Sequence, residues 1–365
     1  MIELERPLGV LVSGAGFLGT LRAAAAIACP HTRLVGIHEV DRARGEQVAA
    51  RFGTVAVDAF DRALELPGVD LVVISTPHAD HEAAIERALS AGKHVLCEKP
   101  LTLESEAGFA LTRRADAAGL KLATGFDHRF LPPVRDALVL HHEWAIGRVE
   151  SVRIEIGHSA SPEFLASWHT DVERSGGGTL FDNGPHACDL IRRWIGDVTH
   201  AKGYVQTTPA LDPRCDVEAF GLFRGRGRAI AELHSSWNLA RGYLTIDVRG
   251  DDGWIHVETA PWRLAAVVAG GRRITRGYLR ERVHARLHRA RFGCEPTHVA
   301  ELADLVARIE GRPHRGATGW DGVHVTEMIE AVYQAARIGE EVTIPDPVVA
   351  RESNSADRAR VASRS

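Results

Sequence analysis

The chain has few cysteines and no arrangement of them that suggests a metal knuckle or a disulfide framework. Its five cysteines are scattered through 365 residues, and none forms a CxxC pair. This usage is typical of a reducing compartment, so we expect a cytoplasmic protein. No stretch reaches the roughly 18 consecutive apolar residues of a membrane helix. The N-terminus is acidic where a signal peptide is basic, and we expect no membrane association.

A strong net charge is also absent. The formal net charge is −4 and charged residues make up 25% of the chain, which gives no overall reason to expect a nucleic-acid partner. The exception is local, because residues 272–291 contain eight arginines and two histidines. This segment could bind a polyanion, but the interpretation we favour is a solvated helix or an arm that faces another subunit.

The alternation of apolar and helical segments indicates the fold of the first third of the chain. A chain of this length predicts two domains. From residue 8 to residue 125, short apolar strands alternate with helices, beginning with the strand Leu8–Ser13. This alternation is typical of βαβ units and predicts an α/β, Rossmann-type, doubly wound parallel sheet. We assign residues 1–125 to this domain.

The pattern changes after Gly125 to strand-like runs separated by glycine-rich turns. We predict a mostly antiparallel sheet from runs at 150–157, 200–208, 216–223, 229–237, 244–249 and 254–258. Helical signals at 187–195, 298–309 and 322–338 are expected to cover one face. Residues 126–350 are therefore predicted to form an α+β domain with a large open sheet, followed by a disordered tail at 351–365. The open face is expected to be buried in a homodimer or homotetramer.

A glycine-rich turn follows the first predicted strand and opens a helix. It reads Gly14-Ala15-Gly16-Phe17-Leu18-Gly19. Such a turn lets the backbone approach a pyrophosphate and leaves helix N–H groups that point at it. We therefore expect a dinucleotide cofactor, NAD or NADP, to contact Gly14, Gly16, Phe17, Leu18 and Gly19.

An acidic residue accompanies this turn at the expected distance. Glu39 stands 20 residues after Gly19, at the end of the second predicted strand, where an acidic side chain binds the ribose hydroxyls. A carboxylate there repels the extra phosphate of NADP, so NAD is favoured. Arg42 or Arg44 could reverse that preference, and Glu39 could instead be an ordinary surface carboxylate.

Two further loops follow strands of the same predicted sheet. Ser75-Thr76-Pro77 ends one apolar strand, and Glu98-Lys99-Pro100 ends the next. Ligands of such sheets bind beyond the carboxyl ends of the strands, so we expect cofactor contacts from Ser75, Thr76, Pro77, His81, Glu98 and Lys99. A lysine in this position can also hydrogen-bond a substrate hydroxyl and help it lose its proton. Either loop could equally be an ordinary surface turn.

A third polar segment runs from Ser175 to Asp189. Asp182 and His186 are four residues apart and His186 and Asp189 three apart, so on a helix they share a face, unless Gly184-Pro185 interrupts it. A histidine beside a carboxylate is a good general acid or base. The same three residues could ligate a metal, but no further cluster completes a site and we expect no metal. A purely structural histidine is the other alternative.

These motifs extend over nearly the whole chain, from Gly9 to about Pro345. They are GAGFLG, STPHADHEAAIERALSAGKHVLCEKPLT, GFDHRFLPPVR, SGGGTLFDNGPHACDLIRRWIGDV and GWDGVHVTEMIEAVYQAARIGEEVTIP. The chain resembles the glucose–fructose oxidoreductase, inositol dehydrogenase and rhizopine-catabolism family, known as Gfo/Idh/MocA. The EKP triplet after a strand, combined with the later GGG…D…H segment, is the most specific part of the resemblance.

The resemblance implies roles for individual residues. Lys99 corresponds to the family's lysine that contacts the reacting hydroxyl, and Asp182 and His186 complete the catalytic group, with His186 as the acid/base. Substrate contacts are implied for Lys99, Asp127, Arg129, Trp168, His169, Asp182 and His186. The chain departs from the family at Asp127, where asparagine is usual, at His169, where many members have a basic residue, and at Glu39, where aspartate is more frequent.

The sequence therefore predicts an NAD(P)-dependent dehydrogenase that oxidises a secondary hydroxyl of a sugar, cyclitol or related polyol. We expect His186 to accept the hydroxyl proton and Lys99 to polarise the oxygen, while Asp182 orients His186 or binds a neighbouring hydroxyl. The polar loop at 158–174 is expected to shape the pocket. The alternatives are an NAD-dependent glycosidase on the same scaffold, a non-catalytic dinucleotide-binding regulator, or a dehydrogenase of non-sugar substrates such as dihydrodiols.

Overall fold

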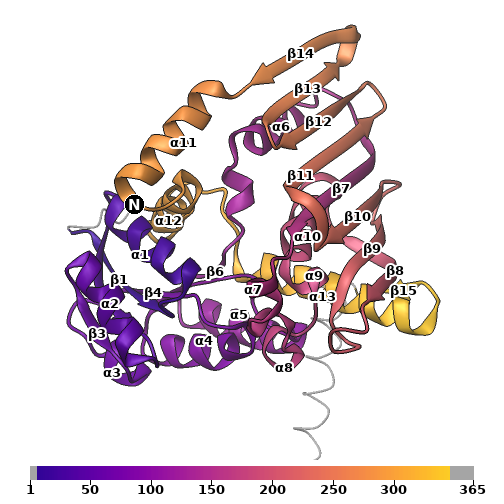
Figure 1. The fold of residues 1–365 in the computed structure, drawn as a ribbon. Helices are drawn as coiled ribbons and strands as arrows, with labels where there is room; N and C mark the ends of the chain where they lie inside the picture. Colours follow the sequence, from indigo (N-terminus) through magenta and orange to yellow (C-terminus); the bar gives the residue numbers. More distant parts are fainter. Residues whose placement is uncertain (1–5, 346–365) are drawn as a thin grey trace, which may run out of the picture.

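The structure is a computed structural model that describes residues 6–345 and contains two β-sheets (Figure 1). The tail predicted at 351–365 lies outside the described residues. In Figure 1 the first sheet and its helices form the lower left of the molecule, and the second sheet rises at the upper right. Within residues 6–345, no helix is long and apolar enough to cross a membrane.

The first sheet has six parallel strands in the order β3-β2-β1-β4-β5-β6. The strands are β1 Leu8–Ser13, β2 Thr32–His38, β3 Val55–Val57, β4 Leu71–Ile74, β5 His94–Cys97 and β6 Leu122–Thr124. The helices are α1 Phe17–Ala28, α2 Arg42–Phe52, α3 Phe60–Leu64, α4 His81–Ser90 and α5 Ser105–Ala117. The strand order reverses between β1 and β4, which is where a doubly wound sheet leaves a crevice for a ligand. The Rossmann-type prediction is confirmed.

The second sheet has nine strands in the order β14-β13-β12-β11-β7-β10-β9-β8-β15. They are β7 Val149–Ser159, β8 Val198–Thr207, β9 Asp216–Gly225, β10 Ile230–Ser236, β11 Asn238–Gly250, β12 Gly253–Thr259, β13 Trp262–Val268, β14 Arg272–Gly277 and β15 Val342–Thr343. Of the neighbouring pairs, β7 and β10 are parallel and the others are antiparallel. The predicted mostly antiparallel sheet is thus confirmed.

Helices cover one face of this sheet and leave the other open, as the sequence predicts. The covering helices are α6 Pro132–His142, α10 Gly184–Ile195 and α13 Gly319–Ile338, whose apolar side chains share one core with those of the strands. Short helices connect them to the site: η1 His78–Asp80, η2 Asp127–Phe130, α7 Pro162–Leu165, η3 Trp168–Thr170, α8 Val172–Ser175 and α9 Thr179–Asp182. Large apolar side chains remain exposed on the sheet, namely Tyr204, Phe220, Leu222, Ile230 and Trp254.

Three features of the second half differ from the sequence prediction. The strands β13, β14 and β15 were not predicted; β14 is rich in arginine and lies at the sheet edge, so it has no apolar alternation. The arginine-rich segment is a short strand followed by a longer helix, because α11 Leu279–Phe292 follows β14. Helix α12 Pro296–Ile309 was expected to cover the second sheet, but its Leu302 and Leu305 pack into the core of the first sheet.

Candidate active site

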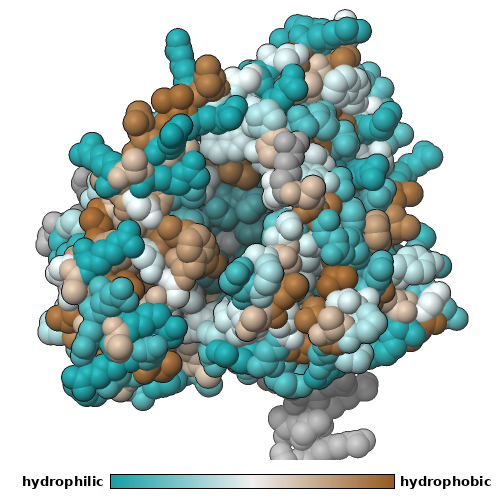
Figure 2. Space-filling model, in the orientation of Figure 1, coloured by the Kyte–Doolittle hydropathy of each residue, from teal (hydrophilic) through white to brown (hydrophobic). Residues whose placement is uncertain are grey.

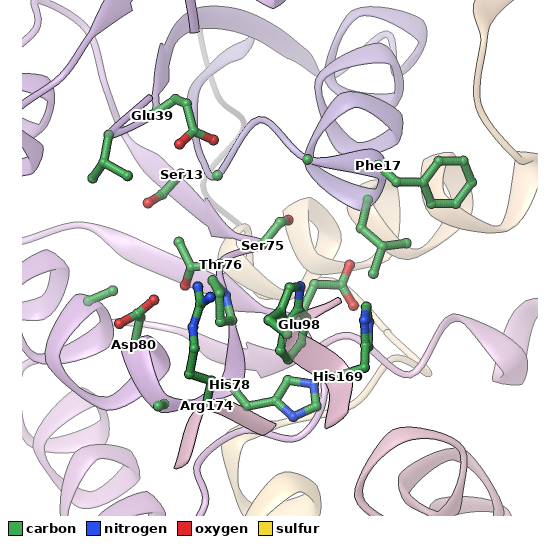
Figure 3. Close-up of a pocket in the computed structure, with 18 of the residues that line it drawn as sticks. Ser13, Phe17, Glu39, Ser75, Thr76, His78, Asp80, Glu98, His169 and Arg174 are labelled. Atoms are coloured by element: carbon green, nitrogen blue, oxygen red, sulfur yellow. The ribbon is translucent and has the colours of Figure 1, made fainter. Parts of the chain in front are cut away.

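A cavity of about 1340 Å³ runs from the glycine-rich turn to Lys99. Small-molecule pockets typically measure about 300–1,000 Å³, so this cavity has room for a dinucleotide and a small substrate. Figure 3 shows Glu39 and Ser13 at one end, Ser75 and Thr76 in the middle, and Glu98 and His169 toward the other end. The face drawn in Figure 2 is also hollowed between the two halves of the molecule.

Gly14 and Gly16 of the turn each need the absence of a side chain, but for different structural reasons. Gly14 has a φ of +93°, and a Cβ atom there would lie 2.5 Å from the carbonyl oxygen of Ser75. A Cβ atom on Gly16 would meet nothing within 4 Å, so this residue leaves open space beside the N-terminus of α1. Because no side chain caps that N-terminus, its N–H groups can bind a phosphate, as the sequence predicts.

Glu39 is buried at the end of β2, and each carboxylate oxygen accepts hydrogen bonds. Oε2 accepts from Ala15 N–H at 2.8 Å, and Oε1 accepts from Asp41 N–H at 3.0 Å and from Arg44 at 2.9 Å. Burial opposes ionisation, but these donors together hold the pKa of Glu39 below its usual range. An anionic Glu39 therefore stands at one end of the cavity, with the half-exposed Arg44 beside it.

The loop after β4 offers two hydroxyls to the cavity. Ser75 and Thr76 line it, and within residues 6–345 their buried hydroxyl oxygens have no hydrogen-bond partner. Buried hydroxyls without partners favour a polar ligand at this place. His81, which the sequence also assigned to the cofactor, does not line the cavity. Its ring nitrogens lie 2.8 Å from the carbonyl oxygen of Pro100 and 3.0 Å from that of Thr76, so it ties the two loops together.

Lys99 and Asp182 form an ion pair on the cavity wall. Lys99 Nζ lies 3.0 Å from Asp182 Oδ1. The other oxygen, Oδ2, accepts a hydrogen bond from Trp237 Nε1–H at 3.0 Å and lies 3.3 Å from His158 Nε2. Burial opposes ionisation of Asp182, but the charge of Lys99 and these donors hold its pKa well below the usual range. An anionic Asp182 thus fixes the position of the ammonium group.

His186 lies close to this wall but is not among the residues that line the cavity. Its ring stacks on that of His128, with centroids 3.8 Å apart, and its Nδ1 has no hydrogen-bond partner among the described residues. Burial, together with the charges of His128 and Lys99, holds the pKa of His186 well below its usual range. His186 is therefore a neutral imidazole at neutral pH, the form that accepts a proton. No hydrogen bond joins it to Asp182 within residues 6–345, so of the two roles predicted for Asp182 the structure shows no contact for the one that orients His186.

The four remaining predicted substrate contacts separate into two groups. Trp168 and His169 line the cavity and stack on each other, with ring centroids 4.0 Å apart. Asp127 and Arg129 lie outside its lining. The buried Arg129 guanidinium is bound by the carboxylates of Asp189 and Asp321, which hold it away from the cavity lining.

Sequence reasoning missed several residues of the wall. His158, Phe164 and Arg174 line the cavity and come from the loop that we expected to shape it, although that expectation named no side chain. His158 directly follows the predicted strand end at Gly157, which is a signal that could have identified it. His78 also lines the cavity and directly follows Pro77, so its place after a predicted strand end was a similar signal. Trp237, which contacts Asp182 from outside the cavity lining, gave no such signal, because only chain folding brings the two together.

The structure does not bring Asp182, His186 and Asp189 together as a metal site, because the Asp189 carboxylate is bound to Arg129. A different set, Asp127, His128 and His186, has ligand atoms within 4.8 Å of one another. The two imidazole rings lie face against face, tilted by 32° from each other. An imidazole binds a metal at about 2.0–2.1 Å through a lone pair in its ring plane. Stacked rings direct these lone pairs to different points, so this geometry does not favour a metal.

Comparison with known proteins identifies the family. A sequence model described as "Oxidoreductase family, NAD-binding Rossmann fold" matches residues 8–126, and a model of the "GFO/IDH/MocA C-terminal domain" matches residues 135–256. The chain belongs to the Gfo/Idh/MocA oxidoreductase family. Residues 8–126 are therefore an NAD-binding Rossmann fold, and the resemblance drawn from the motifs is confirmed.

Individual members of the family share only moderate sequence identity with this chain. Inositol 2-dehydrogenase of Rhizobium meliloti is 31% identical over 50% of this chain and 54% of its own length. The scyllo-inositol 2-dehydrogenase (NAD(+)) of Bacillus subtilis is 27% identical over 70% of this chain and 75% of its own. Among solved structures of this Gfo/Idh/MocA fold, GenD2 from gentamicin A biosynthesis in complex with NAD has a TM-score of 0.78 and 27% identity, covering 94% of this chain and 98% of that one. The match to the first relative thus spans about half of that protein.

Proposed function

We propose that the chain is an NAD-dependent dehydrogenase that oxidises a secondary hydroxyl of a sugar, cyclitol or related polyol. The observation that carries this proposal is one continuous cavity that joins the glycine-rich turn to the Lys99–Asp182 pair. The named inositol dehydrogenases among the relatives support the substrate class. When bound, the nicotinamide supplies the acceptor for the hydride of the carbinol carbon.

The side chains of the wall supply binding, and His186, which lies close to the wall, supplies proton transfer. Lys99 donates a hydrogen bond to the substrate oxygen and stabilises the negative charge that develops on it. Asp182 keeps Lys99 in place through the contact at 3.0 Å. His186, neutral at working pH, takes the hydroxyl proton. Trp168 and His169 offer a flat surface and a polar edge to the substrate.

Glu39 supports NAD as the preferred cofactor. Its buried carboxylate at the end of β2 can accept a hydrogen bond from a ribose hydroxyl and repels a phosphate in the same place. Ser75, Thr76 and the open space at Gly16 suit the phosphate and nicotinamide parts of the dinucleotide.

Two wider features belong to the same proposal. The open face of the second sheet carries five large exposed apolar side chains, which suits a homodimer or homotetramer interface. The described part of the chain has five free buried cysteines, which suits a reducing cytoplasm.

Absorbance at 340 nm tests the proposal. The protein is incubated with NAD or NADP and a panel of inositols, aldoses, amino sugars, sugar acids and nucleotide sugars. We expect the absorbance at 340 nm to rise with NAD and one class of polyol. Binding of NAD without a rise on any member of the panel would contradict the dehydrogenase assignment and favour the glycosidase or the regulator.

A further inference from the structure

The side chain that orients His186 is not the one expected from the sequence. Asp182 is engaged by Lys99, Trp237 and His158, and Nδ1 of His186 has no partner among residues 6–345. The closest ring to His186 is that of His128, at 3.8 Å between centroids, while Phe126 meets it edge-on at 6.2 Å. His186 is therefore held by ring contacts rather than by a carboxylate.

His128 is itself fixed by a short chain of contacts. Its Nδ1 lies 3.1 Å from Asp127 Oδ1, and Asp127 Oδ2 accepts a hydrogen bond from the hydroxyl of Thr297 at 3.0 Å. Thr297 belongs to α12, Asp127 and His128 to η2, and His186 to α10. The chain thus connects the helix that packs on the first sheet with the helix that carries the proposed proton acceptor.

We propose that His128, held by Asp127, is a positioning residue that keeps the His186 ring in place and adjusts the pH range in which His186 accepts a proton. This inference rests on the proposed dehydrogenase function. The contact that fixes His128 is made by a carboxylate, that of Asp127.

Charge supports the second part of the proposal. The His128 ring lies against the face of His186, and its charge opposes protonation of the His186 ring. Lys99, on the loop after β5, acts in the same direction, whereas Asp127 on η2 and Asp182 on α9 favour the protonated form. His298 on α12 faces Asp127 at 3.6 Å, and burial lowers its pKa to about 4, so it stays neutral. Of the groups that act on the protonation of His186, His128 is thus the one whose ring packs against it.

Two substitutions separate the role of the ring from that of the charge. His128→Ala removes both, and we expect kcat to fall about 10-fold or more while the KM for NAD stays unchanged, because a misplaced base slows proton transfer. His128→Phe keeps an aromatic ring but loses the charge. We expect its kcat to stay within about threefold of the unmodified protein, and the acid limb of its kcat/KM profile to move to higher pH.

His284→Ala is the matched control, since His284 is exposed on α11 far along the chain from the site. Thermal unfolding checks that each variant is folded. A readout without turnover is the NMR titration of the His186 ring, whose midpoint we expect to rise in His128→Phe. The inference is overturned if both His128 variants match His284→Ala in kcat, pH profile and titration while His186→Ala is inactive. If instead His186→Ala keeps full turnover, the proposed role of His186 in the reaction fails, and the titration alone decides whether His128 acts on its ring.

Discussion

Asp182 accepts contacts from side chains that are far apart in the sequence. Lys99 follows β5, His158 lies in β7, and Trp237 lies between β10 and β11. The motif predicts that Lys99 and Asp182 share a site, because both belong to the family's catalytic group. It does not predict Trp237 or His158, since nothing in the local sequence shows which strand ends approach α9. The sequence therefore predicts the reacting groups, Lys99 and Asp182, more readily than the side chains that position them.

A single substitution at Glu39 tests the cofactor preference at the residue scale. Glu39→Gln keeps the size of the side chain but removes the charge that repels a 2′-phosphate. We expect the ratio of kcat/KM for NADP over NAD to rise about 10-fold, equivalent to about 1.4 kcal/mol. Steady-state kinetics with both cofactors measures it. Glu46→Gln is the control, because Glu46 is exposed and paired with Arg42. An unchanged ratio in Glu39→Gln would show that Glu39 does not select the cofactor.

At the scale of an element, alanine substitutions at two positions of the glycine-rich turn are expected to have opposite effects on stability. Gly16→Ala adds a methyl group that meets no protein atom within 4 Å, so stability should be retained. The methyl group would occupy the space that a pyrophosphate needs, so the Kd for NAD should rise about 10-fold or more.

Gly14→Ala should instead destabilise the fold, because φ is +93° and the new Cβ would lie 2.5 Å from Ser75 O. We expect a loss of about 1–3 kcal/mol. Denaturant unfolding and calorimetric NAD titration of both variants separate the two effects. An unchanged Kd for NAD in Gly16→Ala would contradict the assignment of Gly16 to the phosphate site.

The elements of the first sheet could be predicted well because its strands are short, apolar and punctuated by glycines. Helix α2, for example, ends where Gly53 adopts a φ of 65°. The second half was harder to predict. Strand β14 alternates no apolar residues, and α12 has an apolar face whose target is decided by tertiary packing against Val10 and Val12. Arg129 shows the same limit, because only the fold brings Asp189 and Asp321 to its guanidinium.

The open sheet face gives a prediction for the whole molecule. Phe220 lies opposite Tyr204 on the neighbouring strand and stacks on His234, and 42% of its surface is exposed. If this face joins two subunits, Phe220→Glu would bury a charge in the interface, and light scattering should show a smaller assembly. Leu279→Glu, on the exposed side of α11, is the control for added charge. An unchanged mass for Phe220→Glu would place any interface elsewhere.

Buried histidines give the whole fold a dependence on pH. Burial lowers the pKa values of His78, His81 and His186 in the native state, so the unfolded chain binds more protons below about pH 6.5. The free energy of unfolding should therefore fall as the pH falls through this range. Glu301 acts in the opposite direction, since burial raises its pKa to about 8.

Because more buried histidines have lowered pKa values than buried carboxyl groups have raised ones, we expect the free energy of unfolding to fall between pH 7 and pH 5.5. Denaturant unfolding followed by tryptophan fluorescence at both values measures it. A free energy of unfolding that rises as the pH falls from 7 to 5.5 would contradict the neutral state of these histidines, including that of His186.

The most direct test of the dehydrogenase account is the rate of absorbance increase at 340 nm with NAD and the best polyol, compared between the unmodified protein and Lys99→Ala. We expect kcat to fall at least about 100-fold, with the Kd for NAD nearly unchanged. Lys121→Ala, next to β6 and away from the cavity lining, should keep its activity. If Lys99→Ala turned over the polyol as fast as Lys121→Ala, the Lys99–Asp182 pair would not be the reacting centre and the account would be wrong.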